Sequence, residues 1–218
     1  MKKITIALSK GYLLKDTLAL FNKCGIDTKV VDTASRQLIF ENKDYRFLLI
    51  RPSDVPVYVE QGVADIGVSG LDIIKESGFD LPILSDLGFG YCELIVAVPN
   101  SSPVNSIGDL KPFSRVATKF VNIAEEYLNA NSLQVEIVKL YGSIEIAPLV
   151  GLADAIIDLT ATGQTLIEND MKIIETISPV TAHLVANPNS LRVKHAQINP
   201  LIEKIEAMNL GQKKLSKK

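Results

Sequence analysis

Residues 145–166 read EIAPLVGLADAIIDLTATGQTL. The apolar run Ala155–Ile157 is typical of a buried strand, which places Asp158 at the carboxyl end of that strand. Small and hydroxylated residues follow at once: Thr160, Ala161, Thr162, Gly163 and Thr165. A short helix is then predicted over residues 164–169. Strand, small-residue turn and helix in this order fit the α/β class of proteins.

The turn within this segment has the composition of an anion-binding loop. Gly and Thr side chains are short, so an anion can reach the backbone N–H groups, and the amino end of the following helix adds partial positive charge. The alternative is an ordinary strand-to-helix turn in which Thr162 only caps the helix. For a turn considered in isolation the capping alternative is favoured, and the rest of the chain reverses that preference.

Strand-like and helix-like segments alternate along the whole chain, as expected for an α/β protein with mainly parallel sheets. We expect strands over residues 3–8, 46–50, 65–68, 93–98, 115–118, 135–140, 155–159 and 183–186. Helical or amphipathic segments are expected over residues 13–23, 55–61, 123–129, 143–152 and 190–209. The lysine-rich tail Gln212–Lys218 is expected to be frayed.

Around residues 86–103 the pattern of alternating strand-like and helix-like segments is interrupted. Gly88-Phe89-Gly90 is a flexible corner, and an apolar strand then leads into the segment PNSSP. We interpret this stretch as a crossing into a second lobe, and the strand over 183–186 as the return. The predicted organisation is residues 1–92 plus 180–218 for lobe I and residues 93–179 for lobe II, which carries the anion-binding turn. Two crossings predict a hinged molecule with a ligand cleft between its lobes.

The composition excludes several classes of protein. With 218 residues, 47% of them apolar and 22% charged, the chain is globular rather than disordered. Its net charge of −2 and its lack of long basic runs give no support to nucleic-acid binding. No apolar stretch approaches the ~20 residues that span a bilayer, and Ser9-Lys10-Gly11 ends the first apolar run too early for a secretory signal. A cytoplasmic protein without a membrane anchor is predicted.

The cysteines and histidines carry no chemical motif. Cys24 and Cys92 lack the spacing of a metal or redox site and are predicted to be reduced core thiols. His183 and His195 have no metal-ligand spacing and are predicted to be structural.

A chain with little net positive charge must hold an anion with a few local cations. The candidates lie beside turns: Lys10, Arg36, Arg51, Arg115 and Lys119. Arg51 is the most informative, because Pro52 restrains it toward extended geometry and its planar guanidinium can bond two phosphate oxygens. Lys10 follows a strand end in Ser9-Lys10-Gly11, although an N-capping serine with an exposed lysine explains that turn equally well. Ser69 and Gly70 follow another strand, where close packing is the simpler interpretation.

Together these motifs resemble one family, the short-form ATP phosphoribosyltransferases, which are catalytic subunits of histidine biosynthesis. The resemblance covers nearly the whole chain: IALSKG at 6–11, RPSDVP at 51–56, ADIG at 64–67 with Gly70, RVATK at 115–119, and the block 145–166. The chain departs from the family pattern at three positions. Tyr12 stands where an arginine often follows the Lys-Gly pair, Val121 replaces a frequent proline, and Ala161 replaces a hydroxylated or acidic residue.

The resemblance implies a fold, a reaction and a cofactor. The fold would be similar to that of type II periplasmic solute-binding proteins. The reaction would be a glycosyl transfer, in which the 5-phosphoribosyl group of 5-phosphoribosyl 1-pyrophosphate moves to N1 of ATP and pyrophosphate is released. This is the first step of histidine biosynthesis. Mg²⁺ would be needed and would arrive mainly on the pyrophosphate, without a dedicated protein site.

The resemblance also implies roles for individual residues. Thr160, Ala161, Thr162, Gly163 and Thr165 would cradle the 5-phosphate, and Asp158 would lie near the ribose hydroxyls. The catalytic cations facing the pyrophosphate and the ATP phosphates would be Lys10, Arg36 and Arg51. ATP would also be bound by Gly11, Ser69 and Gly70, together with Lys10.

The implied partner is a regulatory subunit similar to histidyl-tRNA synthetase, which would assemble with the catalytic chains into a hetero-octamer. The chain has no residues left for the regulatory domain of the long form, so we expect a homodimer that is active alone and sensitive to histidine only with its partner. Two alternatives remain open: a two-lobe solute-binding module without chemistry, and another nucleotide-dependent transferase that uses the same loops.

Overall fold

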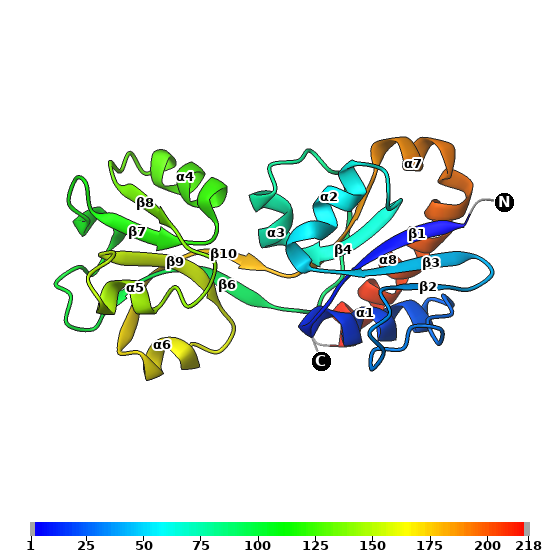
Figure 1. Cartoon of the computed structure of the whole chain (residues 1–218), viewed down its shortest axis with the longest axis horizontal. Coiled ribbons are helices and arrows are strands. Elements are labelled where there is room, and N and C mark those ends of the chain that lie inside the picture. Colours follow the sequence, from blue (N-terminus) through cyan, green and yellow to red (C-terminus); the bar gives the residue numbers. More distant parts are fainter. Residues whose placement is uncertain (1–2, 216–218) are drawn as a thin grey trace. The chain divides into compact units, whose positions relative to one another are not determined.

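The computed structural model describes the backbone of residues 3–215 and the side chains of residues 3–208. The chain divides into two compact units (Figure 1): unit 1 comprises Met1–Gly90 and Thr181–Lys218, and unit 2 comprises Tyr91–Val180. The lobe boundaries expected from the sequence, after residues 92 and 179, fall within two residues of this division. The side chains of the tail Gln212–Lys218 lie outside the described part. No helix in the described residues is long and apolar enough to cross a membrane.

Unit 1 is built on a six-stranded sheet with the order β2-β3-β1-β4-β11-β5. Its strands are β1 (Ile4–Ser9), β2 (Ile39–Glu41), β3 (Tyr45–Ile50), β4 (Ile66–Gly70), β5 (Ile83–Asp86) and β11 (Ala182–Ala186). The three strands β3, β1 and β4 are parallel, with Ser9 opposite Ile50 and Leu8 opposite Val68. Their carboxyl ends therefore meet at one end of the sheet.

Helices cover both faces of this sheet (Figure 1). They are α1 (Tyr12–Lys23), the 3₁₀ turn η1 (Pro52–Asp54), α2 (Val55–Glu60), α3 (Leu71–Glu76), α7 (Pro188–Val193) and α8 (His195–Leu215). Side chains alternate along a strand, so Ile6 and Leu8 of β1 pack in one core cluster with Phe21 of α1, whereas Ala7 packs in another with Val55 of α2. Both faces of β1 are largely buried, which explains its mostly apolar sequence.

Unit 2 is built on a five-stranded sheet with the order β10-β6-β9-β7-β8. Its strands are β6 (Cys92–Pro99), β7 (Arg115–Thr118), β8 (Glu136–Lys139), β9 (Ala155–Thr160) and β10 (Met171–Val180). Its helices are η2 (Ile107–Asp109), α4 (Val121–Ala130), α5 (Ile146–Leu149) and α6 (Gln164–Glu168). Ala147 of α5 and Leu166 of α6 pack with Ile156 of β9, and α4 lies on the other side of the sheet (Figure 1).

The α/β class is confirmed, but the expectation of mainly parallel sheets is wrong. Strands β7, β8 and β9 are parallel, whereas β6 runs antiparallel to both β9 and β10, and β11 runs antiparallel to both β4 and β5. The cause is the connectivity: β6 and β10 carry the chain into and out of unit 2, and β11 follows β10 after a single residue. The longest strand, β10, was not predicted. Two register shifts interrupt its pairing with β6, so its sequence lacks a regular alternation.

Candidate functional site

The carboxyl end of β9 opens into a pocket of about 330 Å³ in unit 2. Glu145 and Ile156 contribute to its wall, and residues 158–166 form the remainder. The pocket lining includes all six residues that were predicted to hold a sugar phosphate: Asp158, Thr160, Ala161, Thr162, Gly163 and Thr165.

Two threonine side chains hold the loop in shape. Thr160 Oγ1 accepts a hydrogen bond of 2.9 Å from the Gly163 N–H, and Thr162 Oγ1 accepts one of 3.3 Å from the Gln164 N–H. Gly163 occupies the N-cap position of α6 with a φ of 74°, in the left-handed region that favours glycine. A Cβ atom built on Gly163 would meet no atom within 4 Å. Thr162 therefore supports the turn, as in the capping alternative, but the cap residue itself is a glycine that leaves the pocket open.

The loop retains unused hydrogen-bond donors. Within the described residues, the backbone N–H groups of Ala161, Thr162 and Thr165 make no hydrogen bond. N–H groups at the first turn of a helix lack intrahelical partners, and an anion is a natural acceptor for them. The pocket is therefore a good fit for a phosphate group.

Lys119, which the sequence named among the cations that could hold an anion without placing it in a particular site, lies beside this pocket. It directly follows β7, whose parallel pairing with β9 sets Thr118 opposite Ile157. Lys119 Nζ is consequently 3.3 Å from Asp158 Oδ1 and 4.8 Å from the ring centroid of Phe120. Its position at a strand end was the signal that could have placed it at this site, because neighbouring parallel strands bring their carboxyl ends together.

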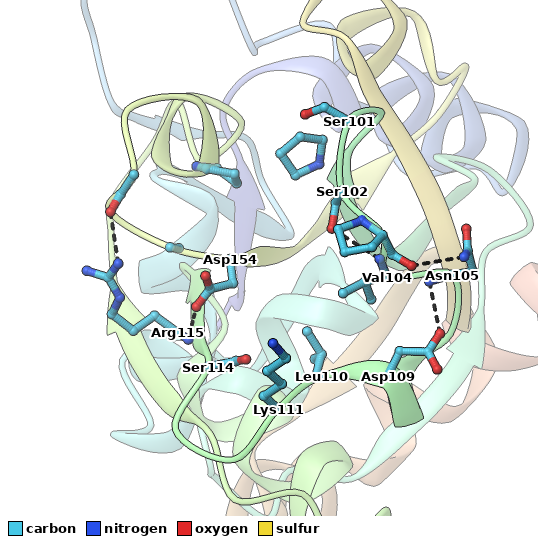
Figure 2. Close-up of a pocket in the computed structure, with 15 residues that line it drawn as sticks. Ser101, Ser102, Val104, Asn105, Asp109, Leu110, Lys111, Ser114, Arg115 and Asp154 are labelled. Atoms are coloured by element: carbon cyan, nitrogen blue, oxygen red, sulfur yellow. Dashed lines mark hydrogen bonds between the residues drawn. The ribbon is translucent and has the colours of Figure 1, made fainter.

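Arg115, another cation that the sequence singled out, lies at the opposite end of the sheet. It begins β7, and it lines a larger pocket of about 650 Å³ together with Asp154 (Figure 2). Its Nη2 donates to the Gly151 carbonyl at 2.9 Å, and its backbone N–H donates to Asp154 Oδ2 at 2.7 Å. Arg115 therefore does not line the pocket at the end of β9; it holds a loop at the amino ends of β7 and β9.

The predicted residues of unit 1 gather at the carboxyl ends of three parallel strands. Lys10 and Gly11 follow β1, Arg51 follows β3, and Gly70 ends β4. The Lys10 N–H donates to the Ile50 carbonyl at 2.8 Å, which fixes the first two strand ends side by side. Arg51 has the extended backbone that Pro52 favours, with φ −64° and ψ 145°.

Arg36 reaches the same end of the sheet by a different route. It precedes β2, which runs antiparallel to β3, and the Leu49 N–H donates to the Leu38 carbonyl at 2.8 Å. The start of β2 therefore lies beside the end of β3. Lys10, Arg36 and Arg51 are all exposed, and in the described part of the chain none of them forms an ion pair. Three uncommitted cations at one end of a sheet can bind a polyanion.

Ser69 and Gly70, in contrast to these cations, offer no exposed polar side chain. Ser69 is fully buried, and its hydroxyl donates to the Pro52 carbonyl at 3.4 Å. A Cβ atom on Gly70 would lie 2.1 Å from Asp72 Oδ1, so a side chain at this position would displace the Asp72 carboxylate. Both residues shape the turn between β4 and α3.

The two histidines lie outside the pocket at the end of β9. His183 Nδ1 is 3.1 Å from the Thr181 carbonyl, and His195 Nδ1 is 3.2 Å from the Arg192 carbonyl. Among the described residues, no three His, Cys, Asp or Glu side chains are grouped so that they could hold a metal ion.

Comparison with known sequences identifies the family. The HisG family model, described as ATP phosphoribosyltransferase, matches residues 51–207. An ATP phosphoribosyltransferase from Halothermothrix orenii is 44% identical over 223 residues, which cover 100% of both chains. Another from Citrifermentans bemidjiense is 46% identical over 207 residues, which cover 93% of this chain and 97% of the relative.

Comparison with solved structures leads to the same family. The ATP phosphoribosyl transferase (HisG:HisZ) complex from Thermotoga maritima contains a chain with 32% identity and a TM-score of 0.81, and the match covers 94% of this chain and 97% of that chain. The periplasmic aliphatic sulphonate binding protein SsuA from Escherichia coli gives a TM-score of 0.62 at 15% identity, covering 99% and 72%. The latter likeness shows the fold alone and confirms the predicted type II periplasmic-binding-protein-like architecture. Because the family model matches most of the chain and these relatives match over nearly their full length, the chain belongs to the ATP phosphoribosyltransferases, the glycosyltransferase-type enzymes of the first step of histidine biosynthesis.

Proposed function

We propose that this chain moves the 5-phosphoribosyl group of 5-phosphoribosyl 1-pyrophosphate to N1 of ATP, with Thr160–Thr165 binding the 5-phosphate. The bond from the anomeric carbon to the pyrophosphate oxygen breaks, and a bond from that carbon to adenine N1 forms. The observation that carries the proposal is the pocket at the end of β9, where the backbone N–H groups of Ala161, Thr162 and Thr165 have no partner among the described residues.

In this proposal the ribose lies next to Asp158. The carboxylate is half-buried in β9, two residues before the strand ends at Thr160, and Asp158 Oδ1 accepts a hydrogen bond of 2.8 Å from the Leu159 N–H. The Lys119 ammonium, 3.3 Å away, balances its charge. An ionised carboxylate held in this way can accept hydrogen bonds from the sugar hydroxyls and orient the anomeric carbon.

The pyrophosphate and the ATP phosphates are assigned to unit 1. Lys10, Arg36 and Arg51 are exposed and unpaired within the described residues, which supports this assignment. Arg51 is assigned the main catalytic role, because a guanidinium can bond two oxygens of the leaving group as negative charge develops there. Gly11 and the turn at Ser69 and Gly70 would shape the surface against which ATP binds.

The proposed chemistry needs little proton transfer. Adenine N1 carries a lone pair that can attack the anomeric carbon directly, so alignment of the two substrates and stabilisation of the leaving pyrophosphate are the main tasks. Neither histidine lies in the pocket at the end of β9, and the proposed reaction assigns neither a role.

Mg²⁺ is part of the proposal as a cofactor. It binds phosphate oxygens and keeps most of its water ligands, so it needs few protein groups. The described residues fit this mode: no cluster of acidic side chains competes for the ion, and Asp158 is already paired with Lys119. When bound, Mg²⁺ would neutralise charge on the pyrophosphate.

The assay is direct. The purified chain is incubated with ATP, 5-phosphoribosyl 1-pyrophosphate and Mg²⁺, and the ultraviolet absorbance of the N1-substituted adenine is followed together with pyrophosphate release. Equal amounts of both products are expected. Binding of both substrates without product would contradict the proposal and favour a binding module.

The proposed assembly has two states. The neighbouring structure from Thermotoga maritima is described as a HisG:HisZ complex, which supports a regulatory partner for this chain as well. We assign this chain to a homodimer in isolation and to a hetero-octamer with a partner similar to histidyl-tRNA synthetase. A cytoplasmic location is proposed with it. Cys24 and Cys92 are both buried, and neither is in a disulfide in the described part of the chain, as expected of thiols in a reducing compartment.

A further inference from the structure

Tyr12 departs from the family pattern, and its hydroxyl has a specific partner. It is the first residue of α1 and directly follows the Lys10–Gly11 turn. Tyr12 Oη donates a hydrogen bond of 2.7 Å to the Gly90 carbonyl. Gly90 is the last residue of unit 1 before the chain passes into unit 2. One side chain thus connects the turn with the free lysine to the segment where the chain leaves unit 1.

The segment 86–90 is also attached to the returning chain. Leu87 N–H donates to the Ala182 carbonyl and Ala182 N–H donates to the Phe89 carbonyl, each at 2.9 Å. Asp86 Oδ1 accepts from the Gly88 N–H at 3.0 Å and from the Thr181 hydroxyl at 2.8 Å. These contacts tie the outgoing and returning segments to each other but not to α1.

Gly90 packs closely against the first turn of α1. A Cβ atom on Gly90 would lie 2.5 Å from Leu13 Cδ2 and 3.0 Å from Tyr12 Oη. Gly88, two residues earlier, has nearly the same left-handed backbone, with φ of 73° against 71°, but a Cβ atom there would meet nothing within 4 Å. Of these two glycines, only Gly90, the last residue before unit 2, therefore lies close to α1.

We propose that Tyr12 is a positioning residue for the transfer reaction: its hydrogen bond to Gly90 couples ligand binding at the Lys10–Gly11 turn to the direction in which the chain leaves unit 1. This inference rests on the proposed function. The hydrogen bond requires one arrangement of the first turn of α1 relative to Gly90. A ligand bound at Lys10 that favours this arrangement raises the population of conformers in which the segment after Gly90 leaves unit 1 in the corresponding direction.

The first test compares two tyrosines. Tyr12→Phe removes the hydrogen bond to Gly90. The control is Tyr91→Phe, at the residue directly after Gly90. It removes a similar hydrogen bond, from Tyr91 Oη to Glu93 Oε1 at 2.9 Å, which does not involve α1. We expect Tyr12→Phe to raise the KM for ATP about fivefold, the typical effect of one lost hydrogen bond, with a smaller change in kcat. Tyr91→Phe should leave both constants unchanged.

The second test measures the coupling itself. Spin labels are placed at Val193→Cys in unit 1 and Tyr141→Cys in unit 2, both highly exposed, while the native Cys24 and Cys92 are buried. The distance distribution between the labels is recorded with and without ATP. It should narrow on addition of ATP in the otherwise unchanged protein and in Tyr91→Phe, and stay broad in Tyr12→Phe.

A second pair of variants disturbs the same contact without changing Tyr12, so that an unrelated effect of the Tyr12→Phe substitution can be recognised. Gly90→Ala forces either Leu13 and Tyr12 or the segment itself to shift, which disturbs the contact with α1, whereas Gly88→Ala has a similar left-handed backbone and open space. Only Gly90→Ala should reproduce the broad distribution. The inference is overturned if ATP leaves the unchanged protein's distribution as it was, or if each variant matches its control. Absence of transferase activity in the unchanged protein would count against the proposed function instead, since the distance measurement does not depend on turnover.

Discussion

Arg51 and Arg46 lie at opposite ends of β3 and form a matched pair for testing the catalytic assignment. Arg51 is exposed and unpaired in the described residues at the carboxyl end, whereas Arg46 pairs with Glu41 near the amino end. We expect Arg51→Ala to lower kcat by about a hundredfold or more, since it removes a charge donor to the leaving group. Arg46→Ala should leave kcat unchanged. Steady-state kinetics of both variants check this, and unchanged turnover in Arg51→Ala would remove it from the mechanism.

Gly163 and Gly151 offer a similar comparison for the phosphate loop. Both have a φ of 74°, and a Cβ atom on either would meet nothing within 4 Å. Valine at either position strains the backbone equally, but only at position 163 does the side chain enter the pocket beside Thr160 and Thr165. Gly163→Val should abolish measurable binding of 5-phosphoribosyl 1-pyrophosphate in calorimetry. Gly151→Val should retain it, and unaltered affinity in Gly163→Val would place the phosphate elsewhere.

Among the elements, α7 is attached to the sheet of unit 1 by a buried charge cluster. Lys194, just after α7, donates to Asp65 Oδ2 at 2.6 Å and to the Lys3 carbonyl at 3.0 Å, and Ser190 donates to Asp65 Oδ1 at 2.6 Å. Asp65 also accepts from the Thr5 N–H at 2.7 Å. The cluster joins the returning chain to β1 and to the turn before β4.

Removing one partner of such a buried pair is costly. We expect Asp65→Ala to lower the free energy of unfolding by about 3–5 kcal/mol, because the Lys194 ammonium and the Thr5 N–H would lose their acceptor. Glu41→Ala, which breaks exposed ion pairs with Lys3 and Arg46, should have little effect. Urea unfolding followed by circular dichroism distinguishes the two. Equal stability of both variants would show that the cluster is not structurally important.

Helix α4 carries a tyrosine whose ionisation should affect stability at high pH. The Tyr127 hydroxyl is buried without a hydrogen bond to the described residues, and this burial, with the nearby Glu175 carboxylate, raises the pKa of Tyr127. A raised pKa in the folded state means that folding favours the neutral phenol. Its contribution is therefore complete below the ordinary pKa of about 10 and is lost as the pH rises above it.

The variant Tyr127→Phe should remove this pH dependence. The free energy of unfolding of the unchanged protein should fall relative to the variant above about pH 10, by at most about 1.4 kcal/mol per pH unit for one group. Tyr141→Phe, an exposed tyrosine in the same unit, controls for loss of a phenol. Parallel curves for the unchanged protein and Tyr127→Phe would contradict the prediction. Chemical unfolding between pH 8 and 11 provides the measurement.

For the complete chain, the proposed assembly predicts how histidine acts. The purified chain should have measurable transferase activity that histidine does not inhibit. Addition of the regulatory subunit should raise the molecular mass in light scattering and make the same activity sensitive to histidine. Inhibition of the isolated chain at the concentrations that inhibit the complex would contradict this division of roles.

Much of the architecture could be predicted because the relevant signals are local. The strand over Arg115–Thr118 has the predicted bounds, and the predicted phosphate loop lines one pocket, because a buried strand followed by small residues needs few long-range contacts to specify it. Three strands were missed, β2, β5 and β10, and two of them show how strongly a strand can depend on its pairing. Strand β2 has only three residues and an exposed–buried–exposed pattern, and β10 is defined by its partner β6 through two irregularities of register.

The local chemistry of this protein was determined by its sequence: which turns can accept an anion, which residues carry charge, and where the chain passes between units. Long-range strand order determined which of those groups meet. Parallel pairing of β7 with β9 brings Lys119 to Asp158 and leaves Arg115 at the opposite end of the same strand. The physical reason is that a side chain's neighbours across a sheet depend on strand direction and register, which a single sequence specifies only through the complete packed core.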